Sequence, residues 1–260
     1  MTATRTLPDE VLYEVEDKVA WLTINRPESR NALNKAARDG IRIGFERFRE
    51  DDDAAVLVLT GAGDKAFCAG GDLKEMADTQ LKIPPKDFMV YLQRTIKVDK
   101  PIIAAVNGVA YAGGFLLAQQ VDLVIAADHA KFAITEARVG RGSPWAAPLP
   151  WLIPPRVAME LLLTAEPITA QRAYEVGLVN KVVPYDQLRD EAGKMARTIA
   201  DNAPLSVRAG KALVFASADY GWEAGLDHGD EIYKPVYLSE DGQEGPRAFR
   251  EKRKPLWRGR

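Results

Sequence analysis

The chain has 260 residues, of which 47% are hydrophobic, and its formal net charge is −2. Such a chain can bury one large core, and its near-neutral charge provides no general field for nucleic acid or an anionic membrane. The single cysteine, Cys68, excludes an internal disulfide, and with only two histidines no Cys/His metal cluster can form at the usual spacing. We therefore expect a globular protein without a metal site and without a nucleic-acid partner.

Neither the N-terminal segment nor the longest apolar tract predicts a membrane protein. Residues 1–10 contain no apolar run of the kind found in signal peptides, which predicts a cytoplasmic location. Residues 102–127 approach the length of a membrane span, but polar residues interrupt them and Gly113-Gly114 divides them. The interrupting residues are Asn107, Gln119, Gln120 and Asp122. We expect two buried elements joined by a turn there.

The first elements are a predicted hairpin, a helix and a strand. Residues 11–15 and 19–24 are rich in β-branched and aromatic residues on either side of Asp17-Lys18, which predicts two hairpin strands. Asn34 can cap a helix whose apolar residues recur at three- and four-residue spacing, closed by the acidic run 50–53. Residues 56–60 then predict a short buried strand.

Strand, glycine-rich loop and helix then repeat along the chain. The glycine-rich stretch 61–71 leads into a predicted helix near Asp72, and a buried strand at 102–106 is followed by another glycine-rich turn and helix. This alternation predicts an α/β fold with mainly parallel strands. After Pro155 strands nearly vanish, Asp186 is expected to cap a helix, and helical patterns continue to Tyr237. We predict an α/β core over residues 1–200 and a C-terminal helical region over 201–260.

Two glycine loops share one design. A buried strand runs into small residues and then into a helix, at Gly70-Gly71 and again at Gly113-Gly114. Glycine allows a ligand close to the backbone, and free N–H groups at such a turn can bind an oxygen that becomes negative during a reaction. The simpler interpretation, in which the glycines only permit tight turns and packing, stays open from this pattern alone.

A nucleotide-binding loop is the competing interpretation. Residues 61–66 fit the G-x-G-x-x-A pattern directly after a strand. However, the motif should open a helix at once, whereas residues 67–71 continue as loop. The expected acid would be Asp87, which lies beside Pro84-Pro85 rather than at a strand end. This disfavours a dinucleotide site.

Few other side chains suggest chemistry. Glu136 lies in an apolar segment, where a carboxylate is costly unless it is paired or used, and a raised pKa would suit proton transfer. A salt bridge to Arg138 or Arg141 is the simpler alternative. The histidines, His129 and His228, have no serine or cysteine partner in a motif, and Cys68 is expected to be packed.

The C-terminal ten residues are basic and contain one aromatic side chain, Trp257. Such a segment could neutralise phosphates and stack on a base, although an ordinary solvated tail is the simpler expectation.

Together these segments resemble the crotonase (enoyl-CoA hydratase/isomerase) family, in the same chain order. Each motif alone is weak, but their order and spacing are specific and extend over nearly the whole chain, which overturns the simpler interpretation of both glycine loops. The resembling stretches are residues 25–27, 31–33, 65–76, 100–108, 168–170, 177–179 and 249–254.

The resemblance implies a spiral of β-β-α turns and a C-terminal helical region that forms homotrimers, often paired as hexamers. It implies an acyl-CoA substrate whose thioester oxygen is held by the N–H groups of Gly71 and Gly113, with Glu136 as acid/base and with no metal or other cofactor. The substrate-binding residues that it implies are Arg30, Ala32, Ala69, Asp72, Leu73, Lys74, Leu116, Trp145, Phe249 and Lys252.

The chain departs from the family's hydratases at Leu116. Hydratases carry a glutamate at the matching position and a second one at the position of Glu136, and the two carboxylates hold the reacting water. A lone base suits double-bond migration, which favours an enoyl-CoA isomerase over a plain hydratase. The loop around Trp145 also lacks the Gly-Gly-Thr-Gln-Arg type of run, which can reshape the acyl pocket. A noncatalytic acyl-CoA-binding or assembly protein stays open.

Overall fold

The computed structural model describes residues 6–260, so the first half of the N-terminal segment considered above lies outside the described residues. The strands are β1 Val11–Glu16, β2 Val19–Ile24, β3 Val56–Gly61, β4 Ala66–Cys68, β5 Ile102–Val106, β6 Val109–Tyr111, β7 Leu123–Ala127, β8 Lys131–Ala133, β9 Ile168–Thr169 and β10 Lys181–Val183. The α-helices are α1 Lys35–Glu50, α2 Leu73–Thr79, α3 Gly113–Gln119, α4 Leu149–Leu152, α5 Pro155–Thr164, α6 Ala170–Glu175, α7 Leu188–Ala200, α8 Pro204–Asp219, α9 Trp222–Leu238 and α10 Glu240–Glu251.

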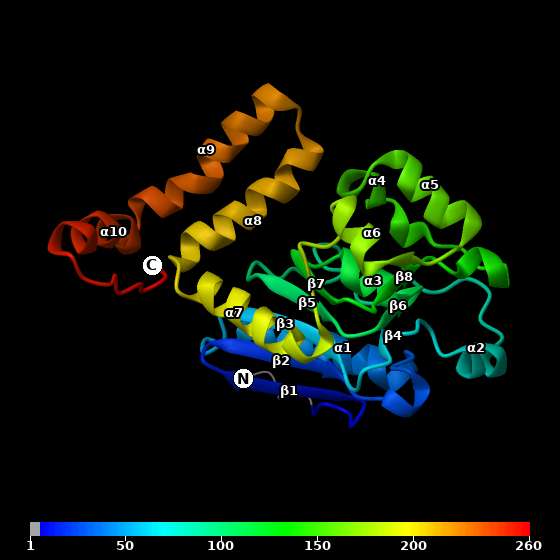
Figure 1. The fold of residues 1–260 in the computed structure, drawn as a ribbon. Helices are drawn as coiled ribbons and strands as arrows, with labels where there is room; N and C mark the ends of the chain where they lie inside the picture. Colours follow the sequence, from blue (N-terminus) through cyan, green and yellow to red (C-terminus); the bar gives the residue numbers. More distant parts are fainter. Residues whose placement is uncertain (1–5) are drawn as a thin grey trace.

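The strands alternate between two sheets. A six-stranded sheet has the order β1-β2-β3-β5-β7-β10, and a four-stranded sheet has the order β4-β6-β8-β9 (Figure 1). Each strand of the inner repeats, β3, β5 and β7, is followed by a short strand in the second sheet, which is parallel to its neighbours except at β9. This confirms the predicted α/β fold built from β-β-α turns.

The N-terminal predictions are confirmed. β1 and β2 pair as an antiparallel hairpin, and Asn34 caps α1 by accepting a hydrogen bond from the Ala37 N–H. The apolar face of α1 packs on this hairpin. The contact is close at Gly44, where a Cβ would lie 2.3 Å from Leu22 Cδ1, so a larger residue would push the helix off the sheet.

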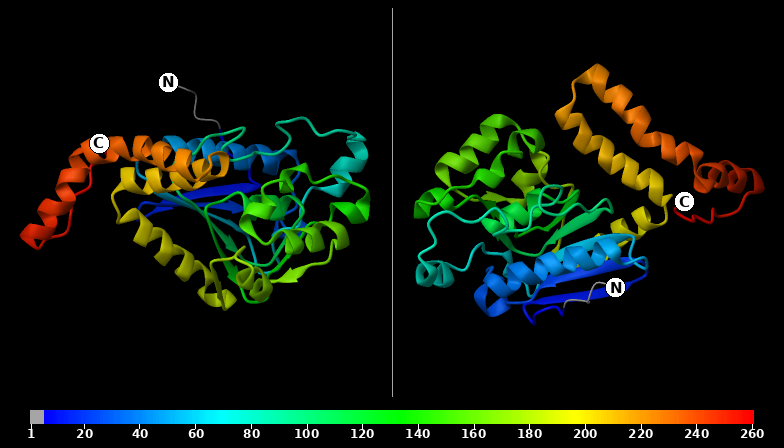
Figure 2. Two further views of the ribbon diagram at one scale, coloured as in Figure 1. Left: turned by 90° about the horizontal axis from the view of Figure 1, so that it is seen from above. Right: turned by 180° about the vertical axis from the view of Figure 1, so that it is seen from behind.

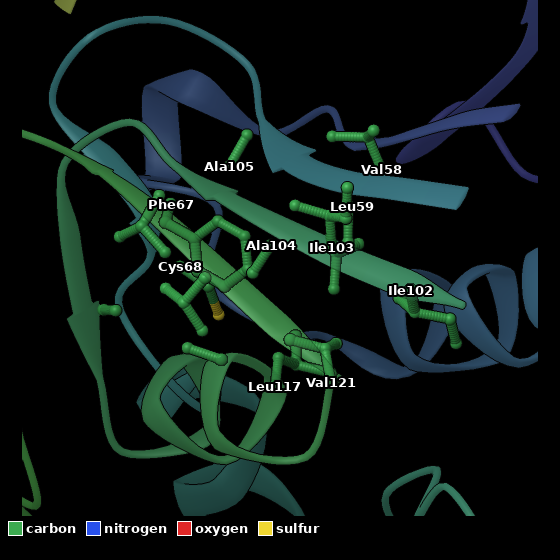
Figure 3. Packing of buried hydrophobic residues seen from close by; sticks show 14 of the residues in the cluster. Val58, Leu59, Phe67, Cys68, Ile102, Ile103, Ala104, Ala105, Leu117 and Val121 are labelled. Carbon is green, nitrogen blue, oxygen red and sulfur yellow. The ribbon is translucent and has the colours of Figure 1, made fainter. Parts of the chain in front are cut away.

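The core lies where β3, β4, β5 and α3 meet. Figure 3 shows Leu59 and Ile103 on neighbouring strands, with Cys68 and Leu117 gathered in the same apolar cluster. Cys68 is fully buried, and burial raises the pKa of its thiol to about 12. It is therefore a packed side chain, as expected, rather than a nucleophile.

Three local predictions are wrong. The stretch 61–71 contains the short strand β4, and residues 102–127 form four elements, β5, β6, α3 and β7, rather than two. The cap predicted at Asp186 is absent, because a 3-10 turn at Tyr185–Gln187 precedes α7. These short elements lack the length over which a hydrophobic period is visible in a sequence.

The last three helices extend away from the sheets. In the views of Figures 1 and 2, α8 and α9 run side by side and α10 lies farthest from α2. Near its middle, α8 is held to the core by Lys211, which forms an ion pair of 2.8 Å with Asp122 and donates to the Lys100 carbonyl. The helical content continues beyond Tyr237 to Glu251, and the boundary at residue 200 stays a prediction.

The basic C-terminal segment is largely exposed, as the simpler expectation has it, but it is held in place by hydrogen bonds. It folds back along α10, where Arg253 pairs with Glu244 and holds the pKa of that carboxyl at about 2. Trp257 donates its indole N–H to the Asp201 carbonyl, and Asp241 accepts from the Gly259 N–H. No helix among the described residues is long and apolar enough to cross a membrane.

Candidate active site

The backbone around Gly71 is arranged so that its N–H group is free. Residues 30–33 run beside residues 69–72: Ala69 N–H donates to the Arg30 carbonyl, Leu33 N–H to Gly70, and Asp72 N–H to Leu33. In such a parallel bridge the residue between the bonded groups points its own N–H the other way. Among the described residues, the Gly71 N–H has no acceptor.

Gly113 begins α3 directly after β6, so its N–H is one of the unpaired donors of the first helical turn. The preceding Ala112 has φ 49° and ψ −114°, a conformation that is strained for a residue with a Cβ. Its N–H is fixed by the Ala133 carbonyl at 3.0 Å, which holds this turn against the start of the loop that leads to Glu136.

The two glycine loops lie against each other. A Cβ on Gly70 would lie 2.8 Å from Ala112 Cβ and 3.5 Å from the Gly113 nitrogen, and Gly70 has φ +103°. A Cβ on Gly113 would lie 3.7 Å from Gly70 Cα. Only glycine at position 70 permits both this conformation and this approach, which brings the predicted donors Gly71 and Gly113 together.

Two arginines hold the helix that follows Gly71. Asp72 caps α2 and also pairs with Arg26 at 3.2 Å, an interaction that lowers the pKa of Asp72 although burial opposes it. Arg38 pairs with Glu75 at 2.8 Å, donates to the Leu33 carbonyl and is almost fully buried. Sequence reasoning missed Arg38, whose place in the helical pattern of α1 resembled that of a surface charge.

Glu136 begins a 3-10 turn after β8, close to the Gly113 loop through the Ala112–Ala133 bond. Its Oε1 accepts a hydrogen bond of 3.2 Å from Trp145 Nε1, whereas the buried Oε2 has no partner among the described residues. Burial raises the pKa of Glu136, although the Trp145 hydrogen bond opposes this shift. Such a carboxyl can exchange a proton more readily than a solvated one.

The expected salt bridge from Glu136 to a neighbouring arginine is wrong. Arg138 pairs with Glu166 instead, and Arg141 donates through Nη1 to the Leu81 carbonyl at 2.8 Å. The 3-10 turn directs both guanidinium groups away from the carboxylate, which leaves Glu136 with one neutral hydrogen-bond donor.

Leu116 and its neighbours on α3 belong to the buried apolar core. Leu116 is 2% exposed, and the ring of the adjacent Phe115 lies 6.0 Å from that of Trp145. On the next turn of α3, Gln119 donates to the Trp145 carbonyl at 2.7 Å, while its buried Oε1 has no donor. This apolar region therefore contains one unpaired polar atom, on a residue that the sequence marked only as an interruption of the apolar tract.

The remaining predicted substrate-binding residues divide into two groups. Arg30, Ala32 and Ala69 lie on the paired segments beside Gly71, and Leu73 and Lys74 open α2 with largely exposed side chains. Phe249 and Lys252 lie on the distant α10, and Phe249 is 86% exposed. Within one chain these two residues do not reach the glycine loops.

The features that suggested other kinds of site do not form one in the structure. The G-x-G-x-x-A stretch runs from the end of β3 into β4 and opens no helix, so the dinucleotide interpretation is wrong. His129 is exposed, lies 2.9 Å from the Asp64 carbonyl and contacts Tyr185, and His228 packs against Tyr220. Within residues 6–260, no group of three acidic, histidine or cysteine residues could hold a metal ion.

Comparison with known proteins assigns the family. Residues 14–260 match the model of the protein family described as Enoyl-CoA hydratase/isomerase. It is 37% identical to carnitinyl-CoA dehydratase of Salmonella paratyphi A, covering 92% of this chain and 94% of that protein. It is also 40% identical to (E)-benzylidenesuccinyl-CoA hydratase of Thauera aromatica, covering 96% and 99%.

Similar solved structures belong to the same family. A probable enoyl-CoA hydratase/isomerase from Mycobacterium abscessus superposes with a TM-score of 0.86 at 40% identity, covering 97% of this chain and all of that one. Enoyl-CoA hydratase from Mycobacterium tuberculosis H37Rv gives 0.88 at 36% identity, with the same coverage. The chain is an acyl-CoA enzyme of the enoyl-CoA hydratase/isomerase family, the crotonase superfamily.

Proposed function

We propose that the protein converts an enoyl-CoA thioester through an enolate held by the Gly71 and Gly113 N–H groups, with Glu136 as the only carboxylate acid/base. The observation that carries this proposal is the environment of Glu136: a largely buried carboxyl with a raised pKa and one unpaired oxygen, beside two loops with free donors. Two such donors, each contributing about 3–4 kcal/mol to the transition state, would stabilise the enolate oxygen.

A single carboxylate favours double-bond migration. The Glu136 carboxylate would remove a proton from Cα of a 3-enoyl-CoA, and the electron pair would spread over the thioester carbonyl and the double bond. The protonated Glu136 would then return the proton to Cγ, giving the conjugated 2-enoyl-CoA and restoring the carboxylate. Leu116 supports this route, because its buried apolar side chain supplies no second base.

Hydration or dehydration is the second candidate, favoured by one observation. Gln119 Oε1 and Glu136 Oε2 are both buried acceptors without donors, and each residue is hydrogen-bonded to Trp145. One water molecule could donate to both acceptors and so be held for attack. The names of the Salmonella and Thauera relatives, a dehydratase and a hydratase, point to the same reaction.

We further propose a homotrimer, or a hexamer made of two trimers. The projecting helices α8 to α10 expose large apolar side chains, including Val214, Trp222, Leu226, Leu238 and Phe249, which a subunit interface would bury. In such an assembly Phe249 and Lys252 would serve the CoA of a neighbouring subunit. Sedimentation of a monomer at micromolar concentration would exclude the assembly. The cytoplasmic location and the lack of a cofactor stay predictions.

The test of the function is a product analysis. The protein is incubated with crotonyl-CoA, a longer trans-2-enoyl-CoA and its 3-enoyl isomer. The products are separated by chromatography and identified by mass spectrometry. Isomerisation changes retention but not mass, whereas hydration adds the mass of water. Both should disappear with Glu136→Gln. Tight binding of all three esters without any product would instead indicate a noncatalytic acyl-CoA-binding protein.

A further inference from the structure

Three buried side-chain atoms lack a hydrogen-bond partner among the described residues: Gln119 Oε1, Glu136 Oε2 and Arg141 Nη2. The first two are acceptors, and a proton can neutralise the Glu136 carboxylate, whereas the third is a donor on a guanidinium group that is always charged. Because this nitrogen cannot lose its charge, burying it without an acceptor is costly, and an acceptor is expected for it.

Arg141 differs from the other buried or half-buried arginines near the site. Arg26 pairs with Asp72 and Arg38 with Glu75, and even the more exposed Arg138 pairs with Glu166. Within the described part of the chain, Arg141 has no carboxylate within ion-pair distance and donates only to a neutral carbonyl, that of Leu81. Its charge therefore lacks the anion that partly buried guanidinium groups usually have.

The contacts of Arg141 place it between the two sides of the site. Its backbone N–H donates to the Glu136 carbonyl at 2.9 Å, on the side of the acid/base. Its Nη1 reaches Leu81, two residues beyond the end of α2, the helix whose other end follows Gly71. Arg141 therefore connects the turn that carries Glu136 to the segment that follows α2.

We infer that Arg141 recognises a carboxylate on the acyl group, so that the substrate is a dicarboxylic enoyl-CoA. This inference rests on the proposed function and names its substrate class. Nη1 keeps the Leu81 carbonyl while the unpaired Nη2 donates to the substrate carboxylate, and shielding from water strengthens this charged hydrogen bond.

The experiment compares pairs of esters that differ by one carboxylate. Turnover is measured with glutaconyl-CoA and crotonyl-CoA, and binding with their saturated counterparts, glutaryl-CoA and butyryl-CoA. We expect the wild-type protein to favour the carboxylated member of each pair, and Arg141→Met to reduce that preference by roughly 10- to 100-fold, as for a charged hydrogen bond. Arg141→Lys should retain part of it. Arg138→Met, which removes a nearby surface charge, is the matched control and should leave both ratios unchanged.

Equal losses for both members of each pair in Arg141→Met would overturn the inference and leave Arg141 as a brace for Leu81. A wild-type preference for crotonyl-CoA and butyryl-CoA would also overturn it. The binding pair separates this failure from failure of the proposed function, because the saturated esters report recognition even if no ester is turned over. Circular dichroism and melting temperature confirm that each variant is folded.

Discussion

Replacing Glu136 by glutamine should reduce activity and increase stability at the same time. The amide keeps the shape of the side chain and can still accept the Trp145 hydrogen bond, but it cannot carry a proton between carbon atoms. A positioned general base contributes about 10²–10⁴-fold, so kcat should fall by that factor while the affinity for CoA esters is retained.

The gain in stability follows from the unpaired Oε2. A buried polar atom without a partner costs about 1–3 kcal/mol and more when its group is charged, so the carboxylate costs more than a neutral amide in the same place. In a protein of this size 1 kcal/mol corresponds to about 2–4 °C in melting temperature, so Glu136→Gln should melt several degrees higher near neutral pH.

The gain should depend on pH in a defined direction. Because the folded protein raises the pKa of Glu136 above the ordinary 4.5, the folded state binds this proton more tightly than the unfolded state. The wild-type protein therefore loses stability as pH rises from 4.5 through the raised pKa, and the glutamine variant does not.

The assay is thermal unfolding of both proteins from pH 4 to 8, beside turnover at each pH. The difference in melting temperature should be small at pH 4 and largest at pH 8, and wild-type turnover should decline as pH falls through the raised pKa. Unchanged turnover in the variant, or a variant less stable than the wild type at pH 8, would refute this account of Glu136.

Three further changes test other parts of the site. Leu116→Glu should raise hydration relative to isomerisation and lower stability, because it places a second carboxylate at a buried apolar position. An unchanged ratio of the two products would contradict this. Arg38→Ala, which removes the ion pair with Glu75 and one of the two donors to the Leu33 carbonyl, should destabilise the fold by about 1–3 kcal/mol and lower kcat more than it raises KM. Lys252→Ala should weaken CoA binding a few-fold at low salt and little at high salt, and a salt-independent loss would exclude a phosphate contact.

Elements with a long hydrophobic period could be predicted from the sequence. The hairpin of β1 and β2 and the helix α1 agree with the prediction, including the Asn34 cap, because runs of β-branched and aromatic residues and a 3.6-residue spacing are visible in the sequence. The second sheet could not be predicted in this way, since its strands are only two or three residues long.

The site shows the same division. The glycine loops could be located because their turns depend on local backbone conformation, as the positive φ of Gly70 illustrates. The partner of Glu136 could not, because the fold of the segment after β8 brings Trp145 back to Glu136 while the favoured Arg138 pairs elsewhere. Which charges meet depends on tertiary packing that a single sequence does not encode in any period.

The chemistry common to the family and the chemistry particular to this chain therefore lie in different kinds of structure. The proposed oxyanion donors, Gly71 and Gly113, belong to the backbone at the ends of sheet strands, where side-chain substitutions elsewhere leave them in place. Leu116, Trp145 and Arg141 lie on α3 and on the loop after β8, and each can change without altering the sheets. If these three side chains decide between isomerisation and hydration and select the acyl group, exchanging them should change the product and the preferred ester while the N–H groups continue to hold the same thioester oxygen.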